Sequence, residues 1–120
     1  MKYLTGCLLV FFLTANAQAD VPTAQQAEVE HLIDFTRTSA CLINRNGSSH
    51  TGEDAAAHIQ KKYDYFRNKI KTTEQFIEYS AAKSTMSGNY YTVRCDGQKP
   101  IRTRDWLLRE LETYRRSGNR

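Results

Sequence analysis

Long hydrophobic runs and cysteines are scarce in this 120-residue sequence. The longest apolar run, Leu8–Leu13, is far shorter than the ~20 residues that a membrane-spanning helix needs. None of the three cysteines forms a C-x-x-C pair, the arrangement typical of catalytic dithiols. A G-x-S-x-G nucleophile elbow, an internal repeat and a domain linker are also missing. These absences disfavour a membrane-embedded protein, a dithiol oxidoreductase and the common serine-hydrolase architecture.

Residues 1–19 have the pattern of a cleavable secretory signal. An early lysine precedes the apolar run, and the small residues of Ala17–Ala19 suit signal peptidase. A lipoprotein box at Leu4–Cys7 is disfavoured because such a box follows the apolar segment, whereas this one precedes it. We expect cleavage after Ala19, a periplasmic or secreted protein that is not transmembrane after cleavage, and a single small helical domain over residues 20–120.

Removal of that segment leaves two cysteines, Cys41 and Cys95. An even pair in an exported protein favours a disulfide, because the compartment outside the cytoplasm is oxidising. We therefore expect a structural Cys41–Cys95 bridge.

The charge of the expected mature chain is mildly basic and unevenly distributed. Sixteen Lys and Arg residues (17 minus Lys2) face 13 Asp and Glu residues, a net charge of +3. Residues 94–120 carry eight cations and four acids. This excess suits an anionic envelope ligand or an acidic envelope protein. Nucleic acid is not expected as a partner outside the cytoplasm.

Apolar residues at helical spacing predict four helices. Thr23 with Gln26 and Thr72 with Gln75 have the form of capping boxes, and Thr51 is an expected N-cap. The first helix is expected to bury Ala27 and to expose Glu28. Thr103 is the expected N-cap of the last helix. The expected helices cover residues 23–38, 51–70, 72–81 and 103–114.

Two short segments predict strands. Residues 41–43 are short and apolar, and residues 90–95 are aromatic and β-branched. The bridge would place them side by side, with a turn at Asn46-Gly47 and a loop over residues 84–89. The predicted fold is mainly α, with about four helices, a short two-stranded β-ribbon and one disulfide.

Several short motifs resemble a known family. They are Arg45-Asn46-Gly47 with His50, Ala57-His58-Ile59, and Ser84 with Ser87-Gly88 and Tyr90. Together they resemble the YfeK-like family of small exported bacterial proteins of unknown function, over roughly residues 24–116. The resemblance implies a periplasmic location but supplies no activity, ligand or catalytic residue.

The spacing of two histidines and two acids defines a candidate metal site. Asp54 and His58 stand four residues apart on an expected helix, and His50 with Glu53 could complete a zinc site. However, at 1.5 Å per residue the helix would separate His50 from His58 by about 12 Å. We expect neither a metal nor a cofactor.

Hydrolysis is the enzymatic alternative. His50 or His58 could act as base toward a serine brought close by folding. The available serines are Ser48, Ser49, Ser84 and Ser87.

Polar-ligand binding is the function that we prefer. The Arg45–His50 turn would lie beside the 84–90 loop, because the bridge joins the segments that flank them. Arginine and lysine there suit a carboxylate, a phosphate or a sugar acid. We therefore predict a non-enzymatic binding or interaction module of the cell envelope, and a structural interaction protein that uses the basic C-terminal helix is a further alternative. The predicted ligand-binding residues are Arg45, Asn46, His50, His58, Lys62, Ser84, Ser87 and Tyr90.

Overall fold

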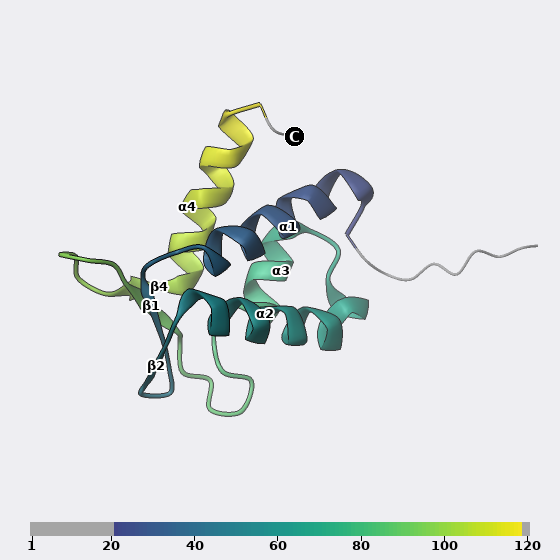
Figure 1. Ribbon diagram of the computed structural model, residues 1–120. Coiled ribbons are helices and arrows are strands. Elements are labelled where there is room, and N and C mark those ends of the chain that lie inside the picture. The colour runs from purple at the N-terminus through teal and green to yellow at the C-terminus, as the bar shows by residue number, and fades with distance from the viewer. Residues whose placement is uncertain (1–20, 119–120) are drawn as a thin grey trace, which may run out of the picture.

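The computed structural model describes residues 21–118, and the expected signal segment at residues 1–19 lies outside them. Figure 1 shows four α-helices packed beside a small antiparallel sheet. The helices are α1 (Thr23–Arg37), α2 (Gly52–Phe66), α3 (Thr73–Ser80) and α4 (Thr103–Arg116), with a 3₁₀ turn, η1 (Arg67–Lys69), after α2. The strands are β1 (Leu42–Arg45), β2 (Ser48–His50), β3 (Thr92–Arg94) and β4 (Ile101–Arg102). Within residues 21–118, no helix is long and apolar enough to cross a membrane.

The helix starts agree with the predicted caps at two places. The hydroxyl of Thr51 accepts a hydrogen bond from the Asp54 amide at 3.2 Å, and that of Thr72 accepts one from the Gln75 amide at 3.1 Å. These caps satisfy backbone donors that the first helical turn leaves without a partner. Both N-cap predictions are confirmed.

At the other two helices the predicted caps are wrong. Pro22 is the N-cap of α1, and its carbonyl accepts bonds from the Gln25 and Gln26 amides, so Thr23 is already helical. Strand β4 runs directly into α4, which makes Arg102 the N-cap and places Thr103 inside the helix with a buried hydroxyl.

The sheet is larger than the predicted two-stranded ribbon. Its strand order is β2-β1-β3-β4, with every neighbouring pair antiparallel. The predicted pairing of the 41–43 segment with the 90–95 segment is correct, since Ile43 faces Val93. Strand β2 was missed because Ser48, Ser49 and His50 offer no apolar alternation, and they pair with β1 through the backbone across the Asn46-Gly47 turn.

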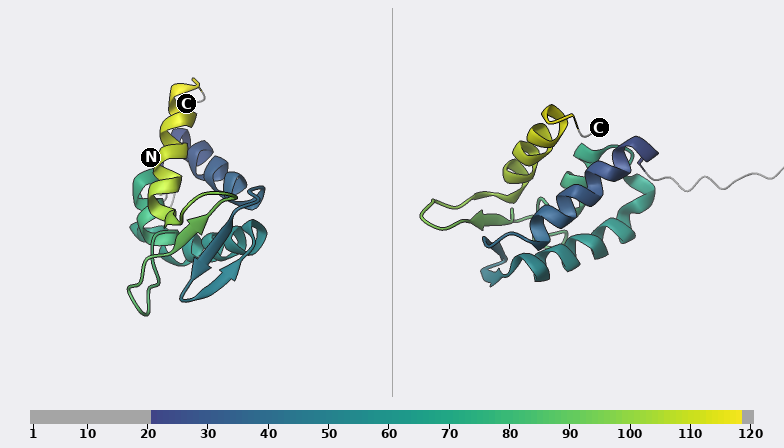
Figure 2. Two further views of the ribbon diagram at one scale, coloured as in Figure 1. Left: turned by 90° about the vertical axis from the view of Figure 1, so that its left-hand side faces the viewer. Right: turned by 45° about the horizontal axis from the view of Figure 1, so that its top comes forward.

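The helices enclose one hydrophobic core, and the sheet contributes a smaller one. The largest fully buried side chains of the helical core are Phe76, Leu32, Ile70, Ile77 and Leu107. On the sheet, Ile43 and Val93 pack with Ala55 of α2, and Trp106 of α4 contacts both cores. The sheet is thus fixed against α2 and α4 (Figure 2).

The disulfide between Cys41 and Cys95 is present and closes a loop with a sequence separation of 54. It joins the start of β1 to the end of β3, which are hydrogen-bonded neighbours. The sheet and the segments that leave it are therefore covalently tied at one end.

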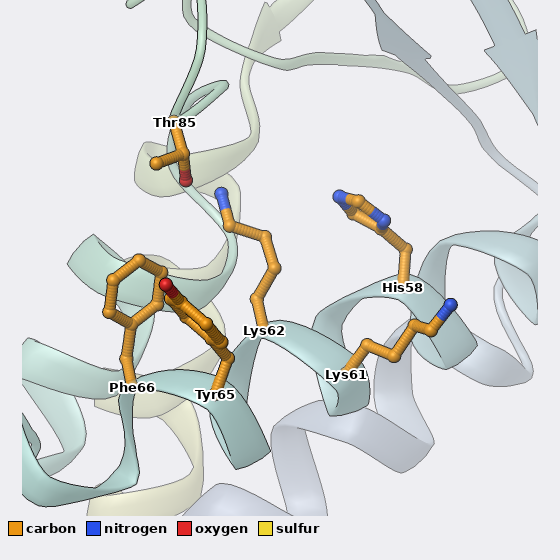
Figure 3. Close-up of a pocket in the computed structure, with 6 residues that line it drawn as sticks. All are labelled: His58, Lys61, Lys62, Tyr65, Phe66 and Thr85. Atoms are coloured by element: carbon orange, nitrogen blue, oxygen red, sulfur yellow. The ribbon is translucent and has the colours of Figure 1, made fainter.

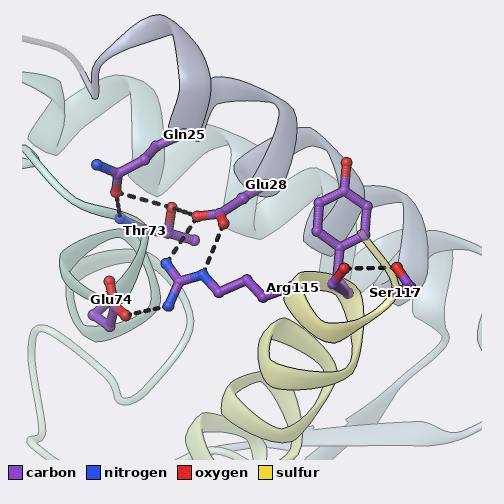
Figure 4. Close-up of polar contacts among 7 residues, drawn as sticks. Gln25, Glu28, Thr73, Glu74, Arg115 and Ser117 are labelled. Atoms are coloured by element: carbon purple, nitrogen blue, oxygen red, sulfur yellow. Dashed lines mark hydrogen bonds and ion pairs between the residues drawn. The ribbon is translucent and has the colours of Figure 1, made fainter. Parts of the chain in front are cut away.

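A partly buried ion pair joins α1 to α4 and corrects the predicted inner face of α1. Glu28 is buried and Ala27 is exposed, the reverse of the expectation. The Arg115 guanidinium donates to both Glu28 carboxylate oxygens at 2.7 and 2.9 Å, and the Thr73 hydroxyl donates to one of them at 2.6 Å (Figure 4). An acid can be buried here because an arginine far along the chain pairs with it.

Candidate functional site

A cavity of about 290 Å³ opens where the end of β1, the middle of α2 and the 84–91 segment meet. We call it the basic cavity. Its lining residues are Arg45, Asn46, His58, Lys62, Ser84, Thr85, Met86 and Tyr91. Five of the eight predicted ligand-binding residues are among them: Arg45, Asn46, His58, Lys62 and Ser84.

Helix α2 supplies two of the polar walls. His58 and Lys62 stand four residues apart, so both side chains lie on one face of the helix. The Lys62 ammonium donates to the Lys83 carbonyl at 2.8 Å and lies 5.3 Å from the centre of the Tyr91 ring. These contacts hold the Lys62 side chain between α2 and the segment of residues 83–91, which forms another wall of the basic cavity.

Tyr91 forms the floor of the basic cavity. It is 5% exposed, and its hydroxyl lies 3.4 Å from Nε2 of His58. Sequence reasoning chose the neighbouring Tyr90 and missed Tyr91, Thr85 and Met86. Because side chains alternate along an extended segment, Tyr91 shares the inward face of Val93, and that spacing could have identified it.

The 84–89 loop is fixed by its own serines. The Ser84 hydroxyl accepts a hydrogen bond from the Ser87 amide at 3.1 Å, and the Ser87 hydroxyl donates to the Asn46 side chain at 2.9 Å. Ser87 therefore holds the rim of the cavity without lining it. The predicted proximity of the 45–50 turn and this loop is realised by the Asn46–Ser87 contact.

His50 and Tyr90 lie outside the walls of the basic cavity. The Arg45 guanidinium contacts Nδ1 of His50 at 3.3 Å, so His50 supports Arg45 from β2. Tyr90 is 42% exposed and its ring lies 3.9 Å from the Arg102 guanidinium. The structure thus places Tyr90 with the β4 edge of the sheet.

Positive charge in the basic cavity is not balanced by acids. Its walls include no Asp or Glu, and none of the ion pairs recorded among residues 21–118 involves Arg45 or Lys62. Nε of Arg45 is buried and has no hydrogen-bond partner in that part of the chain. A buried donor without an acceptor is costly.

Burial and positive charge shift the pKa values of three side chains that line the basic cavity. Burial, followed by the charges of Arg45 and Lys62, lowers the pKa of His58 to about 4, so its imidazole is neutral at pH 7. Burial and Arg45 also lower the pKa of Lys62. Burial raises the pKa of Tyr91, which keeps the phenol protonated.

The same charges are unfavourable for a metal ion. No group of three or more His, Cys, Asp or Glu side chains with metal-binding geometry occurs within the described range 21–118. His50 faces a guanidinium, and His58 is surrounded by Arg45, Lys61 and Lys62. A cation entering either place would be repelled.

For hydrolysis, the relevant contact is that of His58 with its nearest hydroxyl. In the described part of the chain, the recorded side-chain contact of His58 goes to Tyr91 rather than to a serine. Ser84 lines the same cavity, but its hydroxyl closes the turn to Ser87. Within residues 21–118, neither of these contacts joins His58 to a serine hydroxyl.

The basic C-terminal helix uses two of its arginines internally. Arg104 pairs with Glu78 at 2.6 Å, and Arg115 pairs with Glu28 and Glu74. These ion pairs attach α4 to α1 and α3.

Comparison with known proteins places this architecture in a family. Residues 23–115, which include every residue of the basic cavity, match the family of unknown function DUF5329. The chain belongs to the DUF5329 family. It is also 30% identical over 92 residues to the uncharacterized protein YfeK of Salmonella typhimurium, an alignment that covers 76% of this chain and 77% of YfeK. The predicted YfeK-like relationship is thereby confirmed, and no solved structure matches the chain.

Proposed function

We propose that this DUF5329 protein is a non-enzymatic binding module of the bacterial cell envelope, and that the basic cavity takes the anionic group of its ligand. The periplasmic location rests on the signal-like pattern of residues 1–19 and on the small exported family that the chain resembles. The binding role rests on the cavity.

One observation carries the proposal: Arg45, whose buried Nε has no partner within residues 21–118, lines a cavity whose walls hold cations and no acid. Within residues 21–118, Nε of Arg45 has no acceptor, and Lys62 adds a second cation to cavity walls that include no carboxylate. In proteins, charged groups that are partly buried are normally paired. A bound carboxylate or phosphate would supply a hydrogen-bond acceptor to Arg45 and a negative charge to Lys62.

His58 makes the cavity suitable for an anion in a second way. Without a ligand the imidazole is neutral, because its surroundings and neighbouring cations oppose a further positive charge. A bound anion would compensate these cations and favour the imidazolium. Anion binding would therefore raise the pKa of His58 from its free value of about 4, so affinity should increase as the pH falls toward that value.

Titration with inorganic phosphate and with acetate, followed by NMR chemical shifts of the full mature chain, tests the proposal. We expect shifts concentrated on Arg45, His58, Lys62 and Tyr91, and a Lys62→Gln variant that binds about tenfold more weakly, a difference near 1.4 kcal/mol. Lys99→Gln removes an exposed lysine outside the cavity walls and is the matched control. Shifts spread evenly over all lysines, or equal losses in both variants, would contradict the proposal.

A further inference from the structure

A second cavity adjoins the basic cavity and has different walls. Its volume is about 400 Å³, and it shares His58, Lys62 and Thr85 with the basic cavity. Its other lining residues are Lys61, Tyr65 and Phe66. Figure 3 shows Lys62 between His58 and the two aromatic rings, with its ammonium directed toward Thr85.

The aromatic part of this second cavity is exposed to an unusual degree. Tyr65 is 80% exposed, and its ring meets that of Phe66 edge to face at a centroid distance of 4.8 Å. Phe66 in turn lies 5.3 Å from the ring of Tyr79, which is 37% exposed. We call Tyr65, Phe66 and Tyr79 the aromatic ledge. Met86, which lines the basic cavity, is 96% exposed.

Exposed apolar surface beside a cavity is the kind of surface that a ligand covers. Each square ångström of apolar surface removed from water contributes roughly 25 cal/mol, and ligand pockets combine such surface with a few polar groups. Here the polar groups are cations at one end, and the apolar surface starts directly beside Lys62. The two cavities together match a molecule that is anionic at one end and apolar at the other.

A sugar is the alternative occupant of an aromatic surface, and the lining disfavours it. Sugar hydroxyls both donate and accept hydrogen bonds, so they are usually paired with amide or carboxylate side chains. The walls of the second cavity contain no Asn, Gln, Asp or Glu, and two of their polar groups are ammonium donors. An acyl or aryl group needs no such partners.

We propose that the paired cavities bind a single anionic amphiphile, with its phosphate or carboxylate between Arg45, Lys62 and His58 and its acyl or aryl group against Tyr65 and Phe66. The inference rests on the proposed anion binding and specifies its ligand class. It assigns the anion to the basic cavity and the apolar group to the aromatic ledge.

Calorimetric titration of the mature chain with three soluble phosphates separates these parts. Inorganic phosphate reports the anion alone, hexyl phosphate adds an apolar chain, and glucose 1-phosphate adds a sugar. We expect hexyl phosphate to bind at least about tenfold more tightly than inorganic phosphate. Glucose 1-phosphate should resemble inorganic phosphate.

Two variants locate the apolar gain. Tyr65→Ala should remove most of the advantage of hexyl phosphate and leave the Kd for inorganic phosphate unchanged. Because Tyr65 is largely exposed, its truncation should not disturb the core. Tyr90→Ala removes another exposed tyrosine, which lies against Arg102 outside both cavities, and should change neither Kd.

The failures of the two proposals are distinguishable. Equal binding of hexyl and inorganic phosphate, or tighter binding of glucose 1-phosphate, overturns the amphiphile and leaves anion binding intact. Absence of binding by all three phosphates overturns both. Binding to phosphatidylglycerol vesicles without binding of soluble hexyl phosphate would also overturn the inference, since the site would then recognise a membrane surface.

Discussion

The Ser87 hydroxyl donates a 2.9 Å hydrogen bond to the side-chain oxygen of Asn46 and so joins the β1–β2 turn to the 84–89 loop. The two residues are 41 positions apart in the sequence. Asn46 has a positive φ of 51°, a conformation that asparagine tolerates better than most residues, so the turn presents its side chain to the loop. This contact closes one side of the basic cavity.

Replacing Ser87 by alanine should loosen that wall without unfolding the protein. The change removes the bond to Asn46 and one to the Asn89 amide, and an exposed hydrogen bond contributes about 0.5–1.5 kcal/mol. We expect amides of residues 84–89 to exchange faster with solvent and phosphate affinity to fall. Ser49→Ala, on the exposed part of β2, is the control. Unchanged loop exchange in Ser87→Ala would show that the contact does not hold the loop.

His58 should make stability depend on pH between about 4 and its ordinary value of 6.5. Its folded pKa is about 4, so in this window the unfolded chain binds the additional proton. Stability from this residue is therefore complete above pH 6.5 and decreases as pH falls toward 4. Urea unfolding of wild type and His58→Gln at several pH values should show a smaller loss in the variant.

Direct titration of the imidazole provides the second measurement for His58. NMR should place its midpoint near 4 without ligand, and saturating phosphate should move the midpoint upward, because the anion favours the imidazolium. A midpoint of 6.5 in the free protein would contradict the burial and charge that the structure assigns to this residue. A midpoint unaffected by bound phosphate would place the anion elsewhere.

Sequence alone located both loops of the basic cavity, but it did not resolve which tyrosine enters it. The Asn-Gly turn, the capped start of α2 and the cysteine pair were enough to bring Arg45, His58, Lys62 and Ser84 together. Tyr91 required the alternation from Val93, which was available in the sequence. No sequence pattern indicated that the aromatic ledge lines a cavity. Tyr65 lies on the exposed side of α2 and becomes part of a cavity only when the 84–89 loop folds beside the helix.

The buried Glu28 and strand β2 could not be predicted for a different reason: their surroundings come from distant residues. Glu28 is stable inside because Arg115, 87 positions away, neutralises it. Strand β2 is polar throughout, and only its backbone pairing with β1 makes it a strand. A local sequence pattern describes only the side chains of one segment. The burial of Glu28 and the strand conformation of β2 depend on distant or neighbouring segments with which they pair.

The disulfide should contribute a large part of the stability. In the chain-entropy account, closing a loop with a separation of 54 stabilises by about 4 kcal/mol. A Cys41→Ala/Cys95→Ala variant should therefore unfold at a much lower urea concentration. Intact mass of the purified protein before and after reduction and alkylation checks that the bridge forms. Two alkylated thiols without prior reduction would refute it.

Replacing Arg115 by alanine should lower the free energy of unfolding more than replacing its neighbour Arg116. Arg115→Ala removes the guanidinium from the buried Glu28 carboxylate, and the loss of one partner of such a pair costs about 3 kcal/mol. Arg116 is exposed, so Arg116→Ala should change stability by less than about 0.5 kcal/mol. Comparison of the two urea midpoints tests the difference. Equal midpoints would mean that the Glu28 pair contributes nothing.

Gly52, the first residue of α2, should not tolerate even a methyl group. A Cβ there would overlap the Thr36 carbonyl oxygen in the last turn of α1 and would lie 2.8 Å from the carbonyl oxygen of Ser39, just beyond that helix. Gly52→Ala should therefore destabilise the protein by about 2 kcal/mol, because the helix ends must separate, although alanine is the better helix former.

Gly47→Ala is the comparison for Gly52→Ala, because it introduces backbone strain without crowding. Gly47 has open space around it but a φ of +86°, so alanine there should cost about 1 kcal/mol through conformation alone. The two variants should also differ in where they act. Gly52→Ala should speed amide exchange at the end of α1 and the start of α2, whereas Gly47→Ala should affect the β1–β2 turn. Because α2 carries His58 and Lys62, a displaced α2 should also weaken phosphate binding in Gly52→Ala. Wild-type stability in Gly52→Ala would contradict the close approach of α1 to α2.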